Sequence, residues 1–555
     1  MKYQLIAFLM LFLVLTSKAQ VTVGLIQNDP GNMEGYVLFT PNSSDTTYLI
    51  DKCGYRIHDW ASTHPPALSV YLMNDGSILR TARSTPSSFS AGGQGGIIER
   101  IDWNGSITWS FKLANSVECM HHDIYPMSNG NILAIVWDSK TPAEAKAAGR
   151  DTTHIGTTLW SEKIIELQPL GTDSAIIVWQ WKLWDHLVQS YDATKPNFGV
   201  VSDHPELINL NYFTGSATST DWHHINAIDY DESLDQIILS GHNFCEFYII
   251  DHSTSTAEAA THSGGTYGKG GDLLYRWGNP QTYGRGTATD KKLFGQHNVH
   301  LIPPGFKDAG SILLFNNGLS RTGGNYSSVE LISLPKDTTG AFAVPALGSF
   351  LPDSSYWKYT DPIPTNFFSS NISGAQRLQN GNTLICTGEK GTFFEIDSLK
   401  NTIWKYISPT SQGGAILTQG TTPIANPVFR CTEYPLNHPA FNGRTLLPGA
   451  PIELNPVAYS CSMLTGTGDA VSVQQNSMLS IRKYGHQIEL YWNGSPTQAK
   501  ISLLNINGQQ VSKRSENALN NDLPTTWELP EFMANGIYFL RIETDSNSWN
   551  FKVTY

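Results

Sequence analysis

The chain has 555 residues with 48 glycines, 29 prolines and a formal net charge of −12. Its length exceeds what one ordinary hydrophobic core supports, so we expect several domains or a repeat fold. The negative net charge argues against a nucleic-acid-binding surface. The content of 40% hydrophobic residues excludes an intrinsically disordered chain. Many turn residues and short β-branched runs favour an all-β fold.

Residues 1–19 have the pattern of a secretory signal peptide. Lys2 precedes an apolar run from Leu5 to Leu15, and small or polar residues follow up to Ala19. A basic start, a short apolar core and a small-residue cleavage site are typical of export signals. The run is shorter than the roughly 20 residues that span a bilayer, so we expect cleavage near Ala19 and no transmembrane span.

From about residue 35 the sequence repeats a pair of hairpin signals. One is an apolar strand that runs into an Asn-Gly or Asp-Gly turn, and the other is an alternating strand followed by a turn and a Trp or Tyr. Repeats of this size with four strands each predict a six-bladed β-propeller within residues 20–470, and a set of β-sandwiches is the alternative. The units begin near Gly35, Ala67, His121, His223, His297 and Ser373.

Three insertions interrupt the repeats, and such loops carry access and specificity in propellers. Residues 141–154 predict a short helix, residues 184–212 a second helix followed by a loop, and residues 254–271 a connection rich in Ser, Thr and Gly. The repeat pattern stops near residue 408, and we expect residues 408–470 to wrap or link. Strand signals then resume and predict a small C-terminal β-sandwich within residues 471–555.

The six cysteines are widely spaced and form no Cys-x-x-Cys pair, so we expect no zinc site among them. Export permits disulfides. We expect Cys431 to pair with Cys461, because both lie in the irregular segment after the repeats. The other four lie in strand-like contexts and are predicted to be buried small residues: Cys53, Cys119, Cys245 and Cys386.

Three histidine clusters open successive repeats, and in a radial fold these openings converge on one axis. A neutral imidazole can attack an electrophile and form a covalent intermediate, while neighbouring imidazoles and amides stabilise a developing oxyanion. Imidazoles on converging strands can also bind zinc or copper, but no tight ligand spacing occurs, so we assign neither a metal nor a cofactor. The residues of suitable type are His122, His224, Asn226 and His297.

Residues from about 36 to 406 resemble the bacterial arylsulfate sulfotransferases, a six-bladed propeller family. The resemblance implies transfer of a sulfuryl group from a phenolic sulfate donor to a phenol acceptor by a ping-pong route, through a sulfated histidine and without a nucleotide cofactor. No single stretch would suffice to carry it. The matching stretches are 120–131, 221–230, 271–280, 296–297 with 315–318 and Arg321, and 326–330.

The family's site residues can be carried over by position. The resemblance makes His297 the nucleophile. The first of the family's other central histidines matches the pair His121 and His122, of which His122 lies at the equivalent distance from its Asn-Gly turn. His224 and Asn226 match the family's His-x-Asn pattern, which implies that they bind sulfuryl oxygens and polarise the leaving phenol.

One departure concerns the cation of the site. The family pattern has an arginine sixteen residues after that Asn, whereas this chain has His242. A guanidinium binds a sulfuryl group with two parallel hydrogen bonds and a permanent charge, and a histidine offers one donor and a pH-dependent charge. Either His242 takes this role when protonated, or Arg276, Arg321 or a lysine supplies it. The resemblance also implies a hydroxyl from the last blade, from Ser373 or Ser370.

Residues from about 477 to 555 resemble the C-terminal sorting domain of type IX secretion cargo. The resemblance rests on the strand and turn at 503–508, the strand at 536–542 and a terminal strand with Lys552. It implies export across the outer membrane by the type IX secretion machinery and a secreted or cell-surface location. A generic adhesive sandwich is the alternative.

Together these features favour a secreted aryl-sulfate sulfotransferase. The intact central histidines support it. A non-catalytic propeller that binds a glycan or protein partner is the second hypothesis, supported by the missing arginine. A metal or quinone-cofactor oxidoreductase is the third, because quinoprotein propellers look similar.

Overall fold

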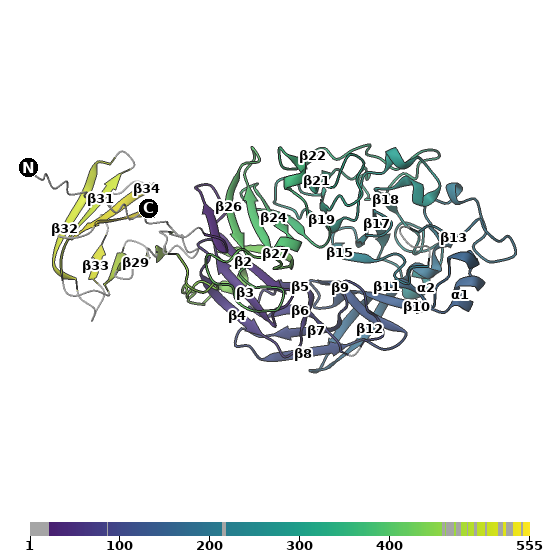
Figure 1. Cartoon of the computed structure of the whole chain (residues 1–555), viewed down its shortest axis with the longest axis horizontal. Coiled ribbons are helices and arrows are strands. Elements are labelled where there is room, and N and C mark those ends of the chain that lie inside the picture. Colours follow the sequence, from purple (N-terminus) through teal and green to yellow (C-terminus); the bar gives the residue numbers. More distant parts are fainter. Residues whose placement is uncertain are drawn as a thin grey trace, which may run out of the picture.

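The computed structural model describes most of the chain from Val21 to Thr554 (Figure 1). The predicted signal peptide lies outside the described residues. Among the described residues no helix is both long and apolar enough to cross a bilayer. The description omits residues 1–20, 86, 214–217, 458–460, 462–470, 473–478, 485–486, 493–496, 506–507, 520–524, 529–536, 545–547 and 555.

Six antiparallel sheets of four or five strands form the body of the described part of the chain before residue 458, beside one small two-stranded sheet. The first contains β27 (Val428–Pro435), β2 (Gly35–Pro41), β3 (Thr46–Asp51) and β4 (Arg56–Ala61). The second contains β5 (Pro66–Leu72), β6 (Ile78–Arg83), β7 (Gly96–Ile101) and β8 (Ile107–Lys112). The third contains β9 (Glu118–Pro126), β10 (Ile132–Lys140), β11 (Leu159–Leu170) and β12 (Ser174–Lys182).

The next three sheets follow the same pattern. The fourth contains β15 (Ile225–Asp231), β16 (Gln236–Gly241), β17 (Glu246–Asp251) and β18 (Tyr275–Trp277). The fifth contains β19 (His297–Leu301), β20 (Ile312–Asn316), β21 (Ser328–Ile332) and β22 (Trp357–Tyr359). The sixth contains β23 (Gly374–Arg377), β24 (Thr383–Thr387), β25 (Thr392–Ile396), β26 (Thr402–Ile407) and β1 (Gly24–Asn28).

The edge strands β27, β5, β9, β15, β19 and β23 contact one another in a closed ring, with β5, β9, β15 and β19 near the middle of this part of the molecule in Figure 1. Strands such as β2 and β20 are buried along their whole length, whereas the outer strand β8 is buried only at Trp109. Continuous apolar runs therefore mark strands covered on both faces by neighbouring sheets. This radial arrangement confirms the predicted all-β propeller fold.

The ring is closed by strands from both ends of the domain. β27 pairs with β2, and β1 pairs with β26. A disulfide joins Cys53, in the turn after β3, to Cys461. The predicted pairing of Cys431 with Cys461 is wrong, because Cys431 lies within β27 as a buried free thiol. The segment after residue 408 thus contributes an inner strand as well as connections.

The predicted short helix within residues 141–154 is confirmed as α1 (Pro142–Ala147), which Thr141 and Glu144 close with a capping box. The helix predicted after residue 184 is wrong. That segment, interrupted by prolines and a glycine, instead forms 3-10 turns η2 (Leu183–Asp185) and η3 (Val201–Asp203) with short strands β13 (Leu187–Val188) and β14 (Ile208–Asn209). The remaining helical elements are α2 (Thr256–Ala259), η1 (Thr152–His154), η4 (Pro280–Tyr283), η5 (Ala288–Asp290), η6 (Pro364–Asn366), η7 (Gly388–Lys390) and η8 (Pro439–Phe441).

The C-terminal part contains two further sheets around one apolar cluster, which includes Trp492, Trp527, Leu503 and Leu540. One sheet contains β28 (Val471–Ser472), β29 (Leu479–Tyr484), β30 (Gln487–Trp492) and β33 (Thr525–Glu528). The other contains β32 (Gln510–Leu519), β31 (Thr497–Asn505), β34 (Ile537–Glu543) and β35 (Ser548–Thr554). Residues of both sheets share this cluster, so the C-terminal part has a hydrophobic core of its own.

Candidate functional site

The backbone turns left-handed at equivalent points of four inner strands. His122, His224, Asn298 and Ser373 have φ of 52°, 61°, 50° and 89°. The pairing of β9, β15 and β19 with their neighbours is irregular at or next to these points. Positive φ is uncommon for residues other than glycine, and strand irregularities re-aim side chains. The repeated distortion gathers polar side chains at one end of the inner ring.

Five imidazoles from three sheets form a continuous row, here called the histidine row. Ring centroids lie 5.1 Å apart for His121 and His122, 4.5 Å for His122 and His224, 5.1 Å for His224 and His242, and 5.2 Å for His242 and His297. The structure therefore brings together the three clusters that the sequence predicted to converge. It also places His242 between His224 and His297.

Burial keeps most of the row neutral. Desolvation lowers the pKa of His122 and of His297 well below the ordinary value of 6.5, and lowers the pKa of His242 to about 4. Neighbouring imidazoles lower these pKa values further, because adjacent positive charges repel. A neutral imidazole has one N–H and one bare nitrogen, so its hydrogen-bond partners decide which nitrogen can react.

The partners of His297 fix its tautomer. Its Nδ1 lies 2.8 Å from Oδ1 of Asn317 and 3.2 Å from the carbonyl oxygen of Gly295. The Asn317 amide is itself oriented, because its Nδ2 donates to the carbonyl oxygens of Ser369 and Ile372. Since both partners of Nδ1 are acceptors, Nδ1 carries the proton and Nε2 keeps a free lone pair. His297 is thus prepared as a nucleophile at Nε2.

A buried carboxyl group stands behind the other end of the row. Glu162, on β11, has Oε2 2.8 Å from Nε2 of His121, and Nδ1 of His121 lies 2.8 Å from Nδ1 of His122. Burial raises the pKa of Glu162 well above its usual range and lowers that of His121. A neutral Glu162 donates to His121, which donates to His122, so Nε2 of His122 carries a proton.

Two further polar groups hold the middle of the row. Nδ1 of His224 hydrogen-bonds to Oδ2 of Asp221, and Nδ1 of His242 lies 2.8 Å from Oδ1 of Asn243. Lys291 is close enough to lower the pKa of His242 electrostatically. The middle of the row therefore combines a carboxylate-paired imidazole, a neutral imidazole and a nearby ammonium group.

The carried-over amide and hydroxyl residues are fully buried. Nδ2 of Asn226 donates to the carbonyl oxygen of Gln296 at 2.8 Å, which ties β15 to the residue before His297. The Ser373 hydroxyl donates to Ser369 and to the carbonyl oxygen of Asn371, and it accepts from the main chain of the following turn. Both groups thus support the neighbouring backbone.

The arginines considered from sequence are engaged with carboxylates. Arg276 is buried, with its Nε and Nη2 on the carboxylate of Glu246. Arg321 donates to Ser328 and lies 3.9 Å from Glu330, with its guanidinium over the Tyr326 ring. Ser370 donates to Glu389. Lys291 lowers the pKa of His242 electrostatically, and its Nζ lies 5.0 Å from the centre of the Phe294 ring.

Sequence reasoning missed four residues that shape the row. Asn317 lies inside one of the stretches that resemble the family, whereas Glu162 has the context of an ordinary strand glutamate. Asp221 was a usable signal, three residues before His224. Gly93 left no signal, yet a Cβ there would lie about 2.0 Å from the His122 ring. Only the packing of adjacent sheets reveals it.

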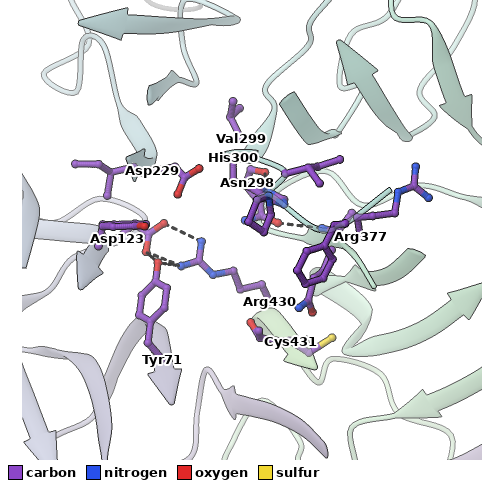
Figure 2. Close-up of a pocket in the computed structure, with 17 residues that line it drawn as sticks. Tyr71, Asp123, Asp229, Asn298, Val299, His300, Arg377, Arg430 and Cys431 are labelled. Atoms are coloured by element: carbon purple, nitrogen blue, oxygen red, sulfur yellow. Dashed lines mark hydrogen bonds and ion pairs between the residues drawn. The ribbon is translucent and has the colours of Figure 1, made fainter. Parts of the chain in front are cut away.

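Further along the inner strands lies a cavity of about 210 Å³, here called the charged chamber (Figure 2). Figure 2 shows Arg430 reaching between Asp123 and Tyr71, and its Nη1 lies 2.7 Å from Oδ2 of Asp123. Burial raises the pKa of Asp229 to about 7 and lowers that of His300 to about 4. Asp123, Asp229 and His300 lie on β9, β15 and β19, the inner strands that position the histidine row, whereas Tyr71 and Arg430 come from β5 and β27.

Comparison with known families gives two matches. The family model described as Arylsulfotransferase (ASST) matches residues 22–422, and the model described as Secretion system C-terminal sorting domain matches residues 485–554. The first spans more than half of the chain. No curated protein matches the chain.

Solved structures of low similarity were also found. A streptogramin B lyase is 11% identical, with a TM-score of 0.33, over 72% of this chain and 86% of that chain. Virginiamycin B lyase from Staphylococcus aureus is 11% identical, with a TM-score of 0.32, over 70% and 85%. The β-propeller domain of Cps50 (Swd1) from Myceliophteria thermophila is 10% identical, with a TM-score of 0.33, over 71% and 89%.

Proposed function

This chain belongs to the arylsulfotransferase family, and from that membership we propose that it transfers a sulfuryl group from a phenolic sulfate ester to an acceptor phenol by a ping-pong route. His297 is the nucleophile, and its sulfated form is the intermediate. The observation that carries the proposal is the pair of acceptors on Nδ1 of His297, which leaves Nε2 bare in a row of neutral imidazoles. The route uses no nucleotide cofactor.

In the first half-reaction, Nε2 of His297 attacks the sulfur of the donor. An N–S bond forms, the S–O bond to the aryl group breaks, and its electron pair goes to the phenolic oxygen. Because burial lowers the pKa of His297, its Nε2 is unprotonated at neutral pH. In the second half-reaction, an acceptor phenol oxygen attacks the same sulfur and Nε2 of His297 leaves with its electron pair.

The proton for the leaving phenol comes from Glu162 through two imidazoles. Nε2 of His122 gives its proton to the phenolate oxygen, His121 passes its Nδ1 proton to His122, and Glu162 passes its proton to His121. The first half-reaction ends with an ionised Glu162. The acceptor phenol then returns a proton along the same path, so one relay acts as acid and then as base.

The sulfuryl oxygens need positive charge and hydrogen-bond donors. In the neutral ring, Nδ1 of His242 donates to Oδ1 of Asn243, so Nε2 of His242 donates to a sulfuryl oxygen only when that ring is protonated. Nδ1 of His224 is likewise occupied by Oδ2 of Asp221. Lys291 takes the place of the family arginine as a permanent cation near His242. A single ammonium group lacks the two parallel donors of a guanidinium, so we expect weaker donor binding than an arginine would give.

The C-terminal sorting domain supports secretion or cell-surface location. We propose that residues 1–19 direct the chain across the inner membrane and that residues 471–555 direct it through the type IX secretion machinery. A phenolic donor and acceptor would then meet the enzyme outside the cell.

The proposal is tested by phenol release from a chromogenic aryl sulfate, with and without an added acceptor phenol. We expect acceptor-dependent release in the wild type and its loss in His297→Ala. His300→Ala is the matched control, because His300 is also a neutral imidazole of β19 but lines the charged chamber. Equal release by folded His297→Ala and wild type would refute the proposed nucleophile. No release by the folded wild type with any aryl sulfate would favour a binding propeller instead.

A further inference from the structure

A second cluster of imidazoles lies in the insertions, outside the histidine row. His186 directly follows η2, and His262 and Asp272 lie in the segment after α2. Oδ1 of Asp272 lies 2.8 Å from Nδ1 of His186 and 2.7 Å from Nδ1 of His262. The three ligand atoms all lie within 4.8 Å of one another. Two imidazole nitrogens and one carboxylate oxygen therefore converge on one point.

The far side of His186 determines which nitrogen faces that point. Its Nε2 lies 2.8 Å from the carbonyl oxygen of Ala259, which can only accept a hydrogen bond. Nε2 thus carries a proton, and in the neutral ring Nδ1 presents a lone pair to the Asp272 carboxylate. Two lone pairs 2.8 Å apart repel unless a proton lies between them or a metal ion lies beside them, within bonding distance of both. A backbone carbonyl on the second nitrogen is the usual support of a metal-binding histidine.

Trp181 and Gly271 pack closely against the His186 ring. Trp181 lies parallel to His186 with ring centroids 5.6 Å apart, and its Nε1 donates to the carbonyl oxygen of Gly271. A Cβ at Gly271 would lie 2.5 Å from Nε2 of His186, so a glycine is required there. The ring is fully buried, whereas the side chain of His262 is 62% exposed. The His186 ring is therefore fixed in place by its surroundings, and solvent reaches the cluster at His262.

We propose that His186, His262 and Asp272 bind a zinc ion. Imidazole and carboxylate ligands suit Zn²⁺, which takes three protein ligands and leaves a fourth position for water. The ion would lie between the two insertions, joining the segment after η2 to the segment after α2. Widely separated positions explain why spacing in the sequence did not reveal this site.

Zinc binding is measured by calorimetry on chelator-treated protein, together with the zinc-induced rise in melting temperature. We expect one zinc ion to bind this cluster, and His262→Ala to weaken that binding at least about tenfold and to lose the melting-temperature rise. His262 is exposed, so its replacement leaves the fold and phenol release intact. His204→Ala is the matched control, because His204 is another partly exposed imidazole beside a carboxylate, that of Glu206.

The histidine row could itself take up zinc, so the result is read from the difference between these two variants. The site is supported if His262→Ala binds one zinc ion fewer than the wild type and His204→Ala does not. Unchanged zinc binding in His262→Ala overturns it, as does a folded wild type that binds no zinc. In the latter case a proton, rather than a metal ion, lies between His186 and Asp272.

Discussion

The histidine row and the charged chamber share the inner strands β9, β15 and β19 but differ in how their polar groups are satisfied. His297 and His300 lie three residues apart on β19, and burial lowers the pKa of both. In the row, the His297 ring lies beside the neutral His242, with ring centroids 5.2 Å apart. In the chamber, His300 lies near Arg430 and Asp123, whose charges already neutralise each other. A neutral imidazole is therefore not enough for reactivity.

The two sites should also differ in whether their residues matter for folding stability or for catalysis. The chamber contains a buried ion pair, whose disruption leaves an uncompensated charge. The row contains left-handed backbone at His122 and His224 and little net charge. Strained backbone of this kind gathers at functional sites. We therefore expect substitutions in the chamber to change folding and substitutions along the row to change turnover.

The largest expected effect comes from breaking the chamber with Arg430→Gln. Asp123 is 1% exposed, so losing its partner should lower the free energy of unfolding by about 3 kcal/mol. Turnover by the folded fraction should change by less than about threefold, well below the effect of losing a catalytic group. Urea unfolding followed by fluorescence gives the first quantity, and phenol release at low temperature gives the second.

Arg100→Gln is the control for that substitution. Arg100 pairs with Asp75 at 2.8 Å on the surface, with both side chains more than 40% exposed, so its loss should cost less than about 1 kcal/mol. If Arg430→Gln abolished turnover without lowering stability, the chamber would have to be counted as part of the reaction site.

The second-largest expected effect comes from removing Glu162, the proton source of the histidine row. Glu162→Gln blocks transfer to His121, and we expect a loss in kcat of about 100-fold for sulfates of weakly acidic phenols. Donors with a strongly acidic phenol should lose far less, because their phenolate leaves without a proton. A plot of kcat against leaving-group pKa separates these outcomes.

Glu166→Gln serves as the control on the same strand, since Glu166 pairs with His252 rather than with the row. A uniform loss for all donors in Glu162→Gln would indicate a structural role for Glu162 and contradict the relay. The same plot for the control should match the wild type.

A smaller effect is expected from Gly93→Ala. The added Cβ would meet the His122 ring at about 2.0 Å, so the ring must leave its position 4.5 Å from the His224 ring and turnover should fall about tenfold. Gly105→Ala is the control, because Gly105 has a similar φ of 85° and nothing within 4 Å of the added Cβ. Both variants share the backbone strain, and equal turnover in the two would contradict the proposed contact.

Strand alternation, Asn-Gly turns and histidine positions predicted the propeller and the convergence of the row, because these signals are local and recur with each repeat. The same signals could not reveal Glu162, because it lies on β11, two strands away from the inner strand β9 that carries His121 and His122. Asn317 was likewise invisible as an orienting group, since its amide is fixed by Ser369 and Ile372 of the next sheet. The Cys53–Cys461 disulfide depends on closure of the whole ring.

The smallest expected effect is the absence of a pH limb near neutrality. An imidazole with the ordinary pKa of about 6.5 would lose roughly three quarters of its unprotonated form at pH 6. Because burial lowers the pKa of His297 and of His242, kcat/KM for the donor should change less than about twofold between pH 8 and pH 6. The unfolded chain takes up these protons near pH 6.5 and the folded chain does not, so stability declines as the pH falls below 6.5. Circular dichroism at each pH separates that loss from a catalytic one. A limb centred near pH 6.5 in folded protein, removed by His242→Arg, would instead identify a protonated His242 as the cation of the row.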